Sequence, residues 1–240
     1  MNNHPLAGSQ YLIDGFKLIF KPGLKRFVII PMMINIALFL GLFFVSHHFF
    51  AEFSQWINNY IPAWLRWIDI ILCILFFAGY SLIFIYTFVT LTNVISAPFN
   101  SLLSEEVERY LTGKGLTNRT WLELMKDIPR TVGRQLVIIG YYLPRAIGLL
   151  ILFLVPAAQI IAAPLWFVFN AWFMTMQYID YPTDNHRISL RDTQEWLGKK
   201  RWLSLSFGSS VLIATMIPLV NFIIVPAAVA GATKLWLEES

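Results

Sequence analysis

The long runs without charged residues limit the folds available to this chain more than any other feature. Residues 27–50 contain no Asp, Glu, Lys or Arg, and these 24 positions exceed the roughly 20 that a helix needs to cross a bilayer. A second run, residues 70–104, contains 35 such positions. The two runs predict transmembrane helices over residues 27–50 and 70–96.

Composition points to the same class of protein. Hydrophobic residues make up 57% of the 240 positions and charged residues only 13%, against about 25% charged residues in soluble domains. No polar stretch is long enough to build a separate soluble core, so residues 1–240 are expected to form a single membrane domain. Residues 9–21 alternate polar and apolar positions at helical spacing, which predicts an amphipathic helix on the membrane surface. Residues 119–134 predict another one.

Two later apolar regions are expected to form helical hairpins, over residues 135–179 and 202–236. Residues 202–233 carry no charge over 32 positions, but two crossings with a turn need about 40 or more. Pro218 divides this segment near its middle, which favours a re-entrant hairpin that penetrates only part of the bilayer. The region 135–179 contains Arg145 and three prolines, and it fits either two crossings or a second partial hairpin.

Basic residues indicate which face of the protein lies in the cytoplasm. Fifteen Lys and Arg residues fall before the first span, between residues 105 and 134, and between residues 187 and 201. The loop 51–69 contains only Arg66. By the positive-inside rule, the three basic zones share the cytoplasmic face.

The sequence PGLKR immediately before the first span is a candidate anion site. Pro22 suits a first helical turn and Gly23 frees the backbone, so the amides of Gly23 and Leu24 can point outward at the positive end of the helix dipole. Lys25 and Arg26 add two cationic side chains beside them. The alternative interpretation is that these basic residues only anchor a cytoplasmic helix end.

Other kinds of chemistry lack their motifs. His47 and His48 diverge by about 100° on a helix and cannot share a metal ion, and the single Cys73 lies in an apolar run, so no metal site is predicted. There is no nucleotide-binding or serine-hydrolase motif, so we expect no enzymatic activity, no cofactor and no nucleic-acid partner. The acidic segment SEEVERYL at residues 104–111 is expected to be a solvated helix face with a Glu105 to Arg109 pair, the alternative being paired acid and base groups.

Five ordered features together give the chain a family resemblance. They are the amphipathic N-terminal helix, PGLKR at 22–26, APFNSLLSEEVE at 97–108, IDYP at 179–182 and IPLVNFIIVP at 217–226. On these features the chain resembles the CysZ family of bacterial sulfate transporters.

The resemblance implies two long transmembrane helices, two half-penetrating hairpins and a homo-oligomer in the bacterial inner (plasma) membrane. It implies sulfate uptake for cysteine biosynthesis, without ATP hydrolysis, by an anion channel or transporter in contact with the lipid bilayer. The family's sulfate-binding signature Gly-Leu-Arg falls on Gly23, Leu24 and Lys25, followed by Arg26. Lysine at the third position lacks the bidentate fork of arginine, so Arg26 is expected to carry more of the anion contact. The competing hypothesis is a membrane scaffold or interaction protein that does not transport.

Overall fold

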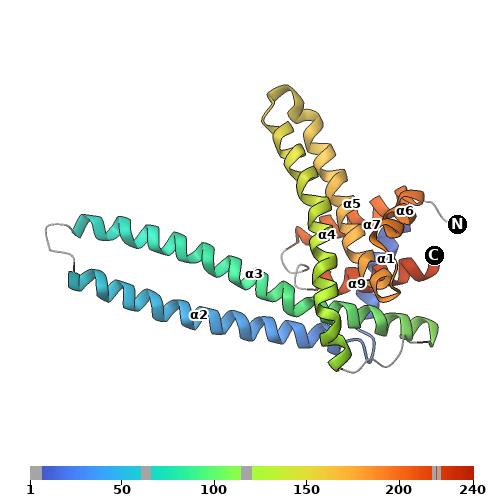
Figure 1. Cartoon of the computed structure of the whole chain (residues 1–240), viewed down its shortest axis with the longest axis horizontal. Helices are drawn as coiled ribbons and strands as arrows, with labels where there is room; N and C mark the ends of the chain where they lie inside the picture. Colours follow the sequence, from blue (N-terminus) through green and yellow to red (C-terminus); the bar gives the residue numbers. More distant parts are fainter. Residues whose placement is uncertain (1–6, 61–65, 115–120, 218–219, 221–222) are drawn as a thin grey trace. The chain divides into compact units, whose positions relative to one another are not determined.

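The described part of the chain is helical throughout. The computed structural model describes residues 7–60, 66–114, 121–217, 220 and 223–240, and none of these forms a strand. The helices, coloured along the chain in Figure 1, are α1 (Ala7–Ile19), α2 (Arg26–Tyr60), α3 (Arg66–Thr112), α4 (Trp121–Phe153), the short 3-10 helix η2 (Pro156–Ala158), α5 (Gln159–Asn185), α6 (Leu190–Lys199), α7 (Arg201–Thr215) and α9 (Ile224–Glu239). The predicted all-α class is confirmed.

The chain divides into two compact units, of which the smaller comprises Ile29–Ala97. It contains most of α2 and α3, which lie side by side as an antiparallel pair in Figure 1 and meet along an aromatic seam. The rings of Phe39 and Phe88 pack edge to face at 5.7 Å, and those of Phe53 and Phe76 stack at 3.8 Å between centroids. Aromatic pairs of this kind hold two helices together where lipid removes the usual hydrophobic driving force.

Both helices of this pair are long enough to cross a membrane. The apolar windows are Arg26–Phe53 and Ile71–Thr92, and neither is buried inside the protein. The helices extend beyond the predicted spans 27–50 and 70–96, because the chain stays helical where it becomes polar. At about 1.5 Å per residue, the 35 residues of α2 exceed the roughly 30 Å of a hydrocarbon core, so its ends reach water. Pro98 lies inside α3 without ending it.

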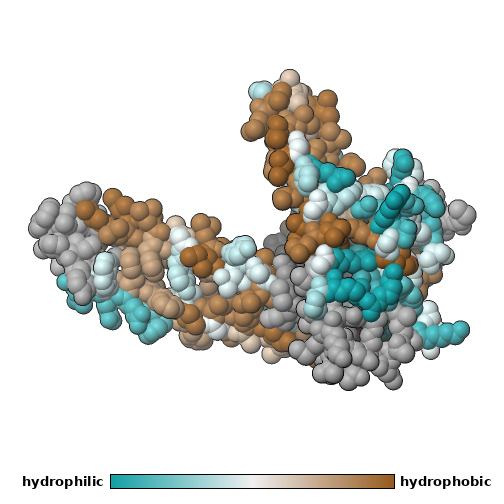
Figure 2. Space-filling model, in the orientation of Figure 1, coloured by the Kyte–Doolittle hydropathy of each residue, from teal (hydrophilic) through white to brown (hydrophobic). Residues whose placement is uncertain are grey.

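The larger unit comprises Met1–Val28 and Pro98–Ser240, and it contains the α4–α5 hairpin. The surface helix expected over residues 119–134 is not a separate element, because α4 continues from Trp121 to Phe153 without a break. Large apolar side chains are exposed around the hairpin end, including Leu154 at 79% and Ile160 at 83%. In Figure 2 this end is brown, the colour of hydrophobic residues.

Length and composition allow both legs of this hairpin to cross a membrane. Their apolar windows are Pro129–Phe153 and Pro156–Asn185. The two alternatives for residues 135–179, two crossings or a partial hairpin, stay predictions.

The core of the larger unit is formed by α1, α5, α7 and α9. Helices approach closely where a glycine faces backbone: a Cβ on Gly15 would overlap the Ala227 carbonyl of α9, and one on Gly208 would overlap the Ala171 carbonyl of α5. Such small residues let helices pack without intervening side chains. The core therefore places the end of α1, and the turn that follows it, in a fixed position against α9.

Helices α7 and α9 occupy the region predicted as the hairpin 202–236. They have 15 and 16 residues, so each reaches only about 23 Å, less than a hydrocarbon core. Pro218, on which the interpretation of a partial hairpin relied, lies outside the described residues. Partial penetration of this segment stays a prediction that the helix lengths favour.

A buried ion cluster joins the base of the α4–α5 hairpin. Arg134 donates from Nε to Asp180 at 2.8 Å and from Nη1 to the carbonyl of Ile188 at 2.6 Å. The same guanidinium lies 3.2 Å from Asp184, which also pairs with Arg130. The Arg134 side chain is 14% exposed and the two carboxylates are 5% and 8% exposed. Arginines that the sequence placed on a surface helix thus bind two carboxylates of α5.

Candidate anion site

The turn between α1 and α2 contains all four predicted anion-binding residues. The N–H of Lys21 donates to the carbonyl of Leu18 at 2.9 Å, and the N–H of Leu24 donates to that of Lys21 at 3.2 Å. Gly23 has φ +89°, in the left-handed region that favours glycine, and a Cβ there would meet nothing within 4 Å. The tight turn thus favours glycine because of its positive φ, and not because a larger side chain would collide with neighbouring atoms.

Leu24 holds this turn against the core. Its side chain is 1% exposed, whereas Gly23, Lys25 and Arg26 on either side of it are exposed. Its carbonyl accepts from the N–H of Phe27 at 3.1 Å, so both its side chain and its backbone are engaged within the protein. Leu24 therefore positions the turn, and its amide is not available to a ligand as the sequence led us to expect.

Other amides in the turn do remain available. Among the described residues, no carbonyl accepts from the N–H groups of Gly23, Lys25 and Arg26. These three groups lie at the start of α2, where the first amides of a helix lack partners within the helix and the dipole is positive. Oriented N–H groups at a helix start are a common way of binding anions.

The two cations beside these amides have different surroundings. Arg26 is the first residue of α2, and its Nη2 lies 3.7 Å from a carboxylate oxygen of Glu106 on α3, with 60% of the side chain exposed. Its guanidinium carbon also lies 4.8 Å from the ring centroid of Phe27. Lys25 is exposed and forms no ion pair with any described carboxylate. One cation is thus paired with a carboxylate across helices, and the other is exposed without a described carboxylate partner.

Glu106 and Arg109 belong to this site, and the sequence analysis did not identify them as such. Arg109 donates to Glu106 at 2.9 Å, so the Glu106 carboxylate lies between two arginines from different helices. The expectation of a solvated acidic face is wrong, because Glu105 and Glu108 are only 5% and 8% exposed. Glu106 and Arg26 are 80 positions apart, and no spacing rule connects them. The only available signal was the charge of the segment.

Acidic residues elsewhere in the unit do not suggest metal binding. Among the described residues, no three His, Cys, Asp or Glu side chains lie close enough together to hold a metal ion. Glu108 lies 2.9 Å from Nε2 of His186, whose ring packs against Trp236 at 4.4 Å between centroids. This pair connects α3 to the end of α5 and to α9.

Known proteins resemble this chain over nearly its whole length. Residues 11–226 match the family model described as "EI24: Sulfate transporter CysZ/Etoposide-induced protein 2.4". A protein of Pseudomonas fluorescens named sulfate transporter CysZ is 46% identical over 238 residues, which cover 98% of this chain and 94% of the relative. Proteins of the same name are 43% identical in Pseudomonas aeruginosa, over 98% of this chain and 96% of the relative, and 40% identical in Pectobacterium atrosepticum, over 99% and 86%. The matched region includes the turn between α1 and α2 and the segment of α3 that carries Glu106.

Proposed function

Since the chain belongs to the sulfate transporter CysZ/etoposide-induced protein 2.4 family, we propose that it transports sulfate across the bacterial inner membrane without ATP hydrolysis. The sulfate taken up would supply cysteine synthesis. The observation that carries the proposal is the turn at residues 22–26, where free amides of a left-handed glycine turn stand beside two exposed cations.

The chemistry of sulfate suits this turn. Sulfate is a dianion at neutral pH and has no proton to donate, so it needs hydrogen-bond donors and positive charge around it. The N–H groups of Gly23, Lys25 and Arg26 provide the donors, and the side chains of Lys25 and Arg26 provide the charge. Leu24 contributes by holding the turn in place.

The carboxylate of Glu106 gives the site the moderate affinity that transport requires. An ion has to bind firmly enough to enter and weakly enough to leave. Glu106 already lies 3.7 Å from Arg26, so an arriving sulfate competes with it for the same guanidinium. We propose that Glu106 forms its ion pair with Arg26 again when sulfate leaves.

Substitutions in the turn test the site. Charge-assisted hydrogen bonds contribute about 1.5–3 kcal/mol each, so Arg26→Ala should weaken sulfate binding by about 10- to 100-fold, and Lys25→Ala by less. Gly23→Val keeps the charge but disfavours positive φ, and it should weaken binding as well. Gly23→Asn is the matched variant, because asparagine tolerates the left-handed region and should retain more affinity.

The measurements are sulfate titration of the purified protein and radiolabelled sulfate flux into proteoliposomes without nucleotide. Arg191→Ala is the charge control, since Arg191 is 87% exposed on α6 and, among the described carboxylates, pairs with Glu195 on its own helix alone. If affinity and flux survive both Arg26→Ala and Gly23→Val in folded, inserted protein, these residues only anchor α2. A wild-type protein that neither binds nor passes sulfate would instead favour the membrane scaffold hypothesis.

Assembly is the second part of the proposal. We expect a homo-oligomer, as the family resemblance implies. Every protomer should have the same orientation in the membrane, because fifteen basic residues lie in the three zones assigned to one face and one basic residue lies in the loop 51–69.

A further inference from the structure

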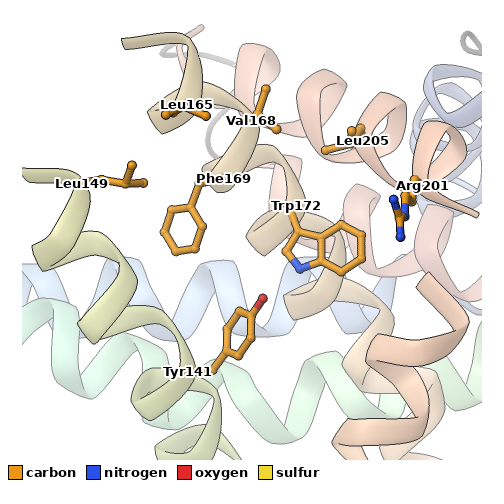
Figure 3. Close-up of a pocket in the computed structure, with 8 residues that line it drawn as sticks. All are labelled: Tyr141, Leu149, Leu165, Val168, Phe169, Trp172, Arg201 and Leu205. Atoms are coloured by element: carbon orange, nitrogen blue, oxygen red, sulfur yellow. The ribbon is translucent and has the colours of Figure 1, made fainter. Parts of the chain in front are cut away.

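A groove of about 440 Å³ runs between α4, α5 and α7 in the larger unit. Figure 3 shows the side chains that line it: Tyr141, Leu149, Leu165, Val168, Phe169, Trp172, Arg201 and Leu205. All except Arg201 are apolar or aromatic. The groove is open to its surroundings, and it lies apart from the turn that contains the proposed sulfate site.

The groove has a cationic end and an apolar end. Arg201, the first residue of α7, lies beside Trp172 in Figure 3, and Leu149 and Leu165 lie at the opposite side. A second cation lies next to the groove at Tyr141, since the guanidinium carbon of Arg145 lies 3.8 Å from the ring centroid of Tyr141. Arg201 is thus the charged residue of the lining, and the lining at Leu149 and Leu165 is apolar.

Helix register relates the two ends of the groove to the base and to the exposed apolar end of the α4–α5 hairpin. Thr175 of α5 donates to the carbonyl of Ser204 on α7 near the start of α7, on the same side as the ion cluster of Arg134 and Asp180. From Tyr141 to Leu149 the groove follows α4 for eight residues, about 12 Å, toward the exposed apolar end of the hairpin. The end at Arg201 therefore lies nearer the polar base, and the end at Leu149 and Leu165 lies nearer the exposed apolar end of the hairpin.

We propose that this groove binds an anionic phospholipid, with the phosphate at Arg201 and one acyl chain lying along the groove toward Leu149 and Leu165. Charge complementarity identifies the occupant. Arg201 donates from Nε to the carbonyl of Gly198 at 3.1 Å, and no described carboxylate forms an ion pair with it. Its remaining guanidinium donors can form bidentate bonds with a phosphate.

The surroundings of Arg201 fit an interfacial headgroup. Lys199 is exposed and forms no ion pair with any described carboxylate, although Glu195 lies one turn earlier on the same helix. Lys200 is engaged by Glu239 and is not available. Trp202 is 62% exposed, and tryptophan is enriched at the level of lipid headgroups. Exposed cations, an interfacial tryptophan and an apolar groove below them match the two chemical halves of one phospholipid.

Lipid retention tests the proposal. The full-length protein is reconstituted into vesicles of phosphatidylcholine with 10% phosphatidylglycerol, re-extracted in detergent, and analysed for phosphatidylglycerol bound per chain. Arg201→Gln should lower this retention at least tenfold. Arg191→Gln makes the same change of charge on an exposed α6 residue outside the groove and should leave retention unchanged.

A second variant tests the acyl-chain part of the groove. Leu205→Trp fills the groove and should lower the retention of both phospholipids, whereas Arg201→Gln, on an exposed side chain, should affect the anionic one selectively. Brominated acyl chains should quench tryptophan fluorescence less in Trp172→Phe than in the wild type. Phosphatidylglycerol retention that is equal in wild type, Arg201→Gln and folded Leu205→Trp overturns the proposal. So does a change of oligomer size in Leu205→Trp without loss of lipid, which would assign the groove to a contact between copies.

Discussion

Replacing Arg134 by leucine tests whether the ion cluster at the base of the α4–α5 hairpin stabilises the fold. The substitution leaves the carboxylates of Asp180 and Asp184 in place, and these are only 5% and 8% exposed. Arg134 currently donates to Asp180 at 2.8 Å and to the Ile188 carbonyl at 2.6 Å. Asp184 keeps Arg130, so Asp180 is the group that loses its partner.

The burial of the cluster decides the expected magnitude. An exposed ion pair contributes about 0–1 kcal/mol, whereas removing one partner of a buried pair costs about 3–5 kcal/mol. Because Arg134 is 14% exposed, the larger range applies. For a chain of this size, 1 kcal/mol shifts Tm by about 2–4 °C, so Arg134→Leu should lower Tm by about 6–20 °C.

Thermal unfolding of the purified protein in detergent measures this shift. Arg191→Leu is the control, because Arg191 is 87% exposed and its pair with Glu195 at 3.2 Å lies on the surface, so its Tm should fall by less than about 4 °C. The double variant Arg134→Leu with Asp180→Asn removes the charge that would be left buried and should recover part of the loss. If Arg134→Leu melts no lower than Arg191→Leu, the cluster behaves as a surface pair and the reasoning from burial fails.

Three further outcomes follow from the structure. Glu106→Gln removes the carboxylate that competes with sulfate, so sulfate titration should show affinity a few-fold higher than in the wild type. A hydrogen bond from Lys234 at 2.7 Å holds the pKa of Asp14 below its usual value. The pair therefore stabilises the fold fully above the unfolded pKa of about 3.9, and this stabilisation is lost as the pH falls through the lower pKa of the folded state. Asp14→Asn should therefore melt a few degrees below the wild type at pH 7, by about 1 kcal/mol, and the difference should shrink below pH 4 in melting curves. In a background with Cys73 replaced by serine, a cysteine at Met216 should be shielded from aqueous thiol reagents on the far side of the membrane. A cysteine in the loop between α2 and α3 should react with the same reagents. Ready labelling at Met216 would mean that the segment 202–236 crosses the membrane.

Local features of the sequence predicted the elements whose causes are local. Charge-free runs predicted the apolar helices because water and lipid sort residues over about 20 positions. Glycine at position 23 predicted an unrestricted backbone, and its φ of +89° uses that freedom, although Pro22 lies in a turn before α2 and not in the first helical turn that the sequence suggested. The same reasoning failed within α4, where the amphipathic part and the apolar part were read as two elements. A helix does not end where its polarity changes, since its backbone hydrogen bonds continue across the boundary.

Contacts between distant segments could not be predicted in this way. The pairs of Arg26 with Glu106 and of Arg134 with Asp180 join residues 80 and 46 positions apart, and they depend on how whole helices pack. Sequence patterns can count charges but cannot match a cation with its carboxylate. The assignment of PGLKR as an anion site therefore identified its cations and missed the carboxylate that competes for one of them.

The pairing of its cations decides what this protein can offer to an anion. Arg134 and Lys234 are less than a quarter exposed and bound by carboxylates at 2.8 and 2.7 Å, so an external anion would have to displace a buried partner. Lys25 and Arg201 are exposed and have no described carboxylate partner, and Arg26 has only Glu106 at 3.7 Å. Because exposed cations bind an external anion without that cost, the turn at residues 22–26 and the start of α7 are among the places where anions are expected to bind. Buried arginines and lysines of the same charge serve the fold instead.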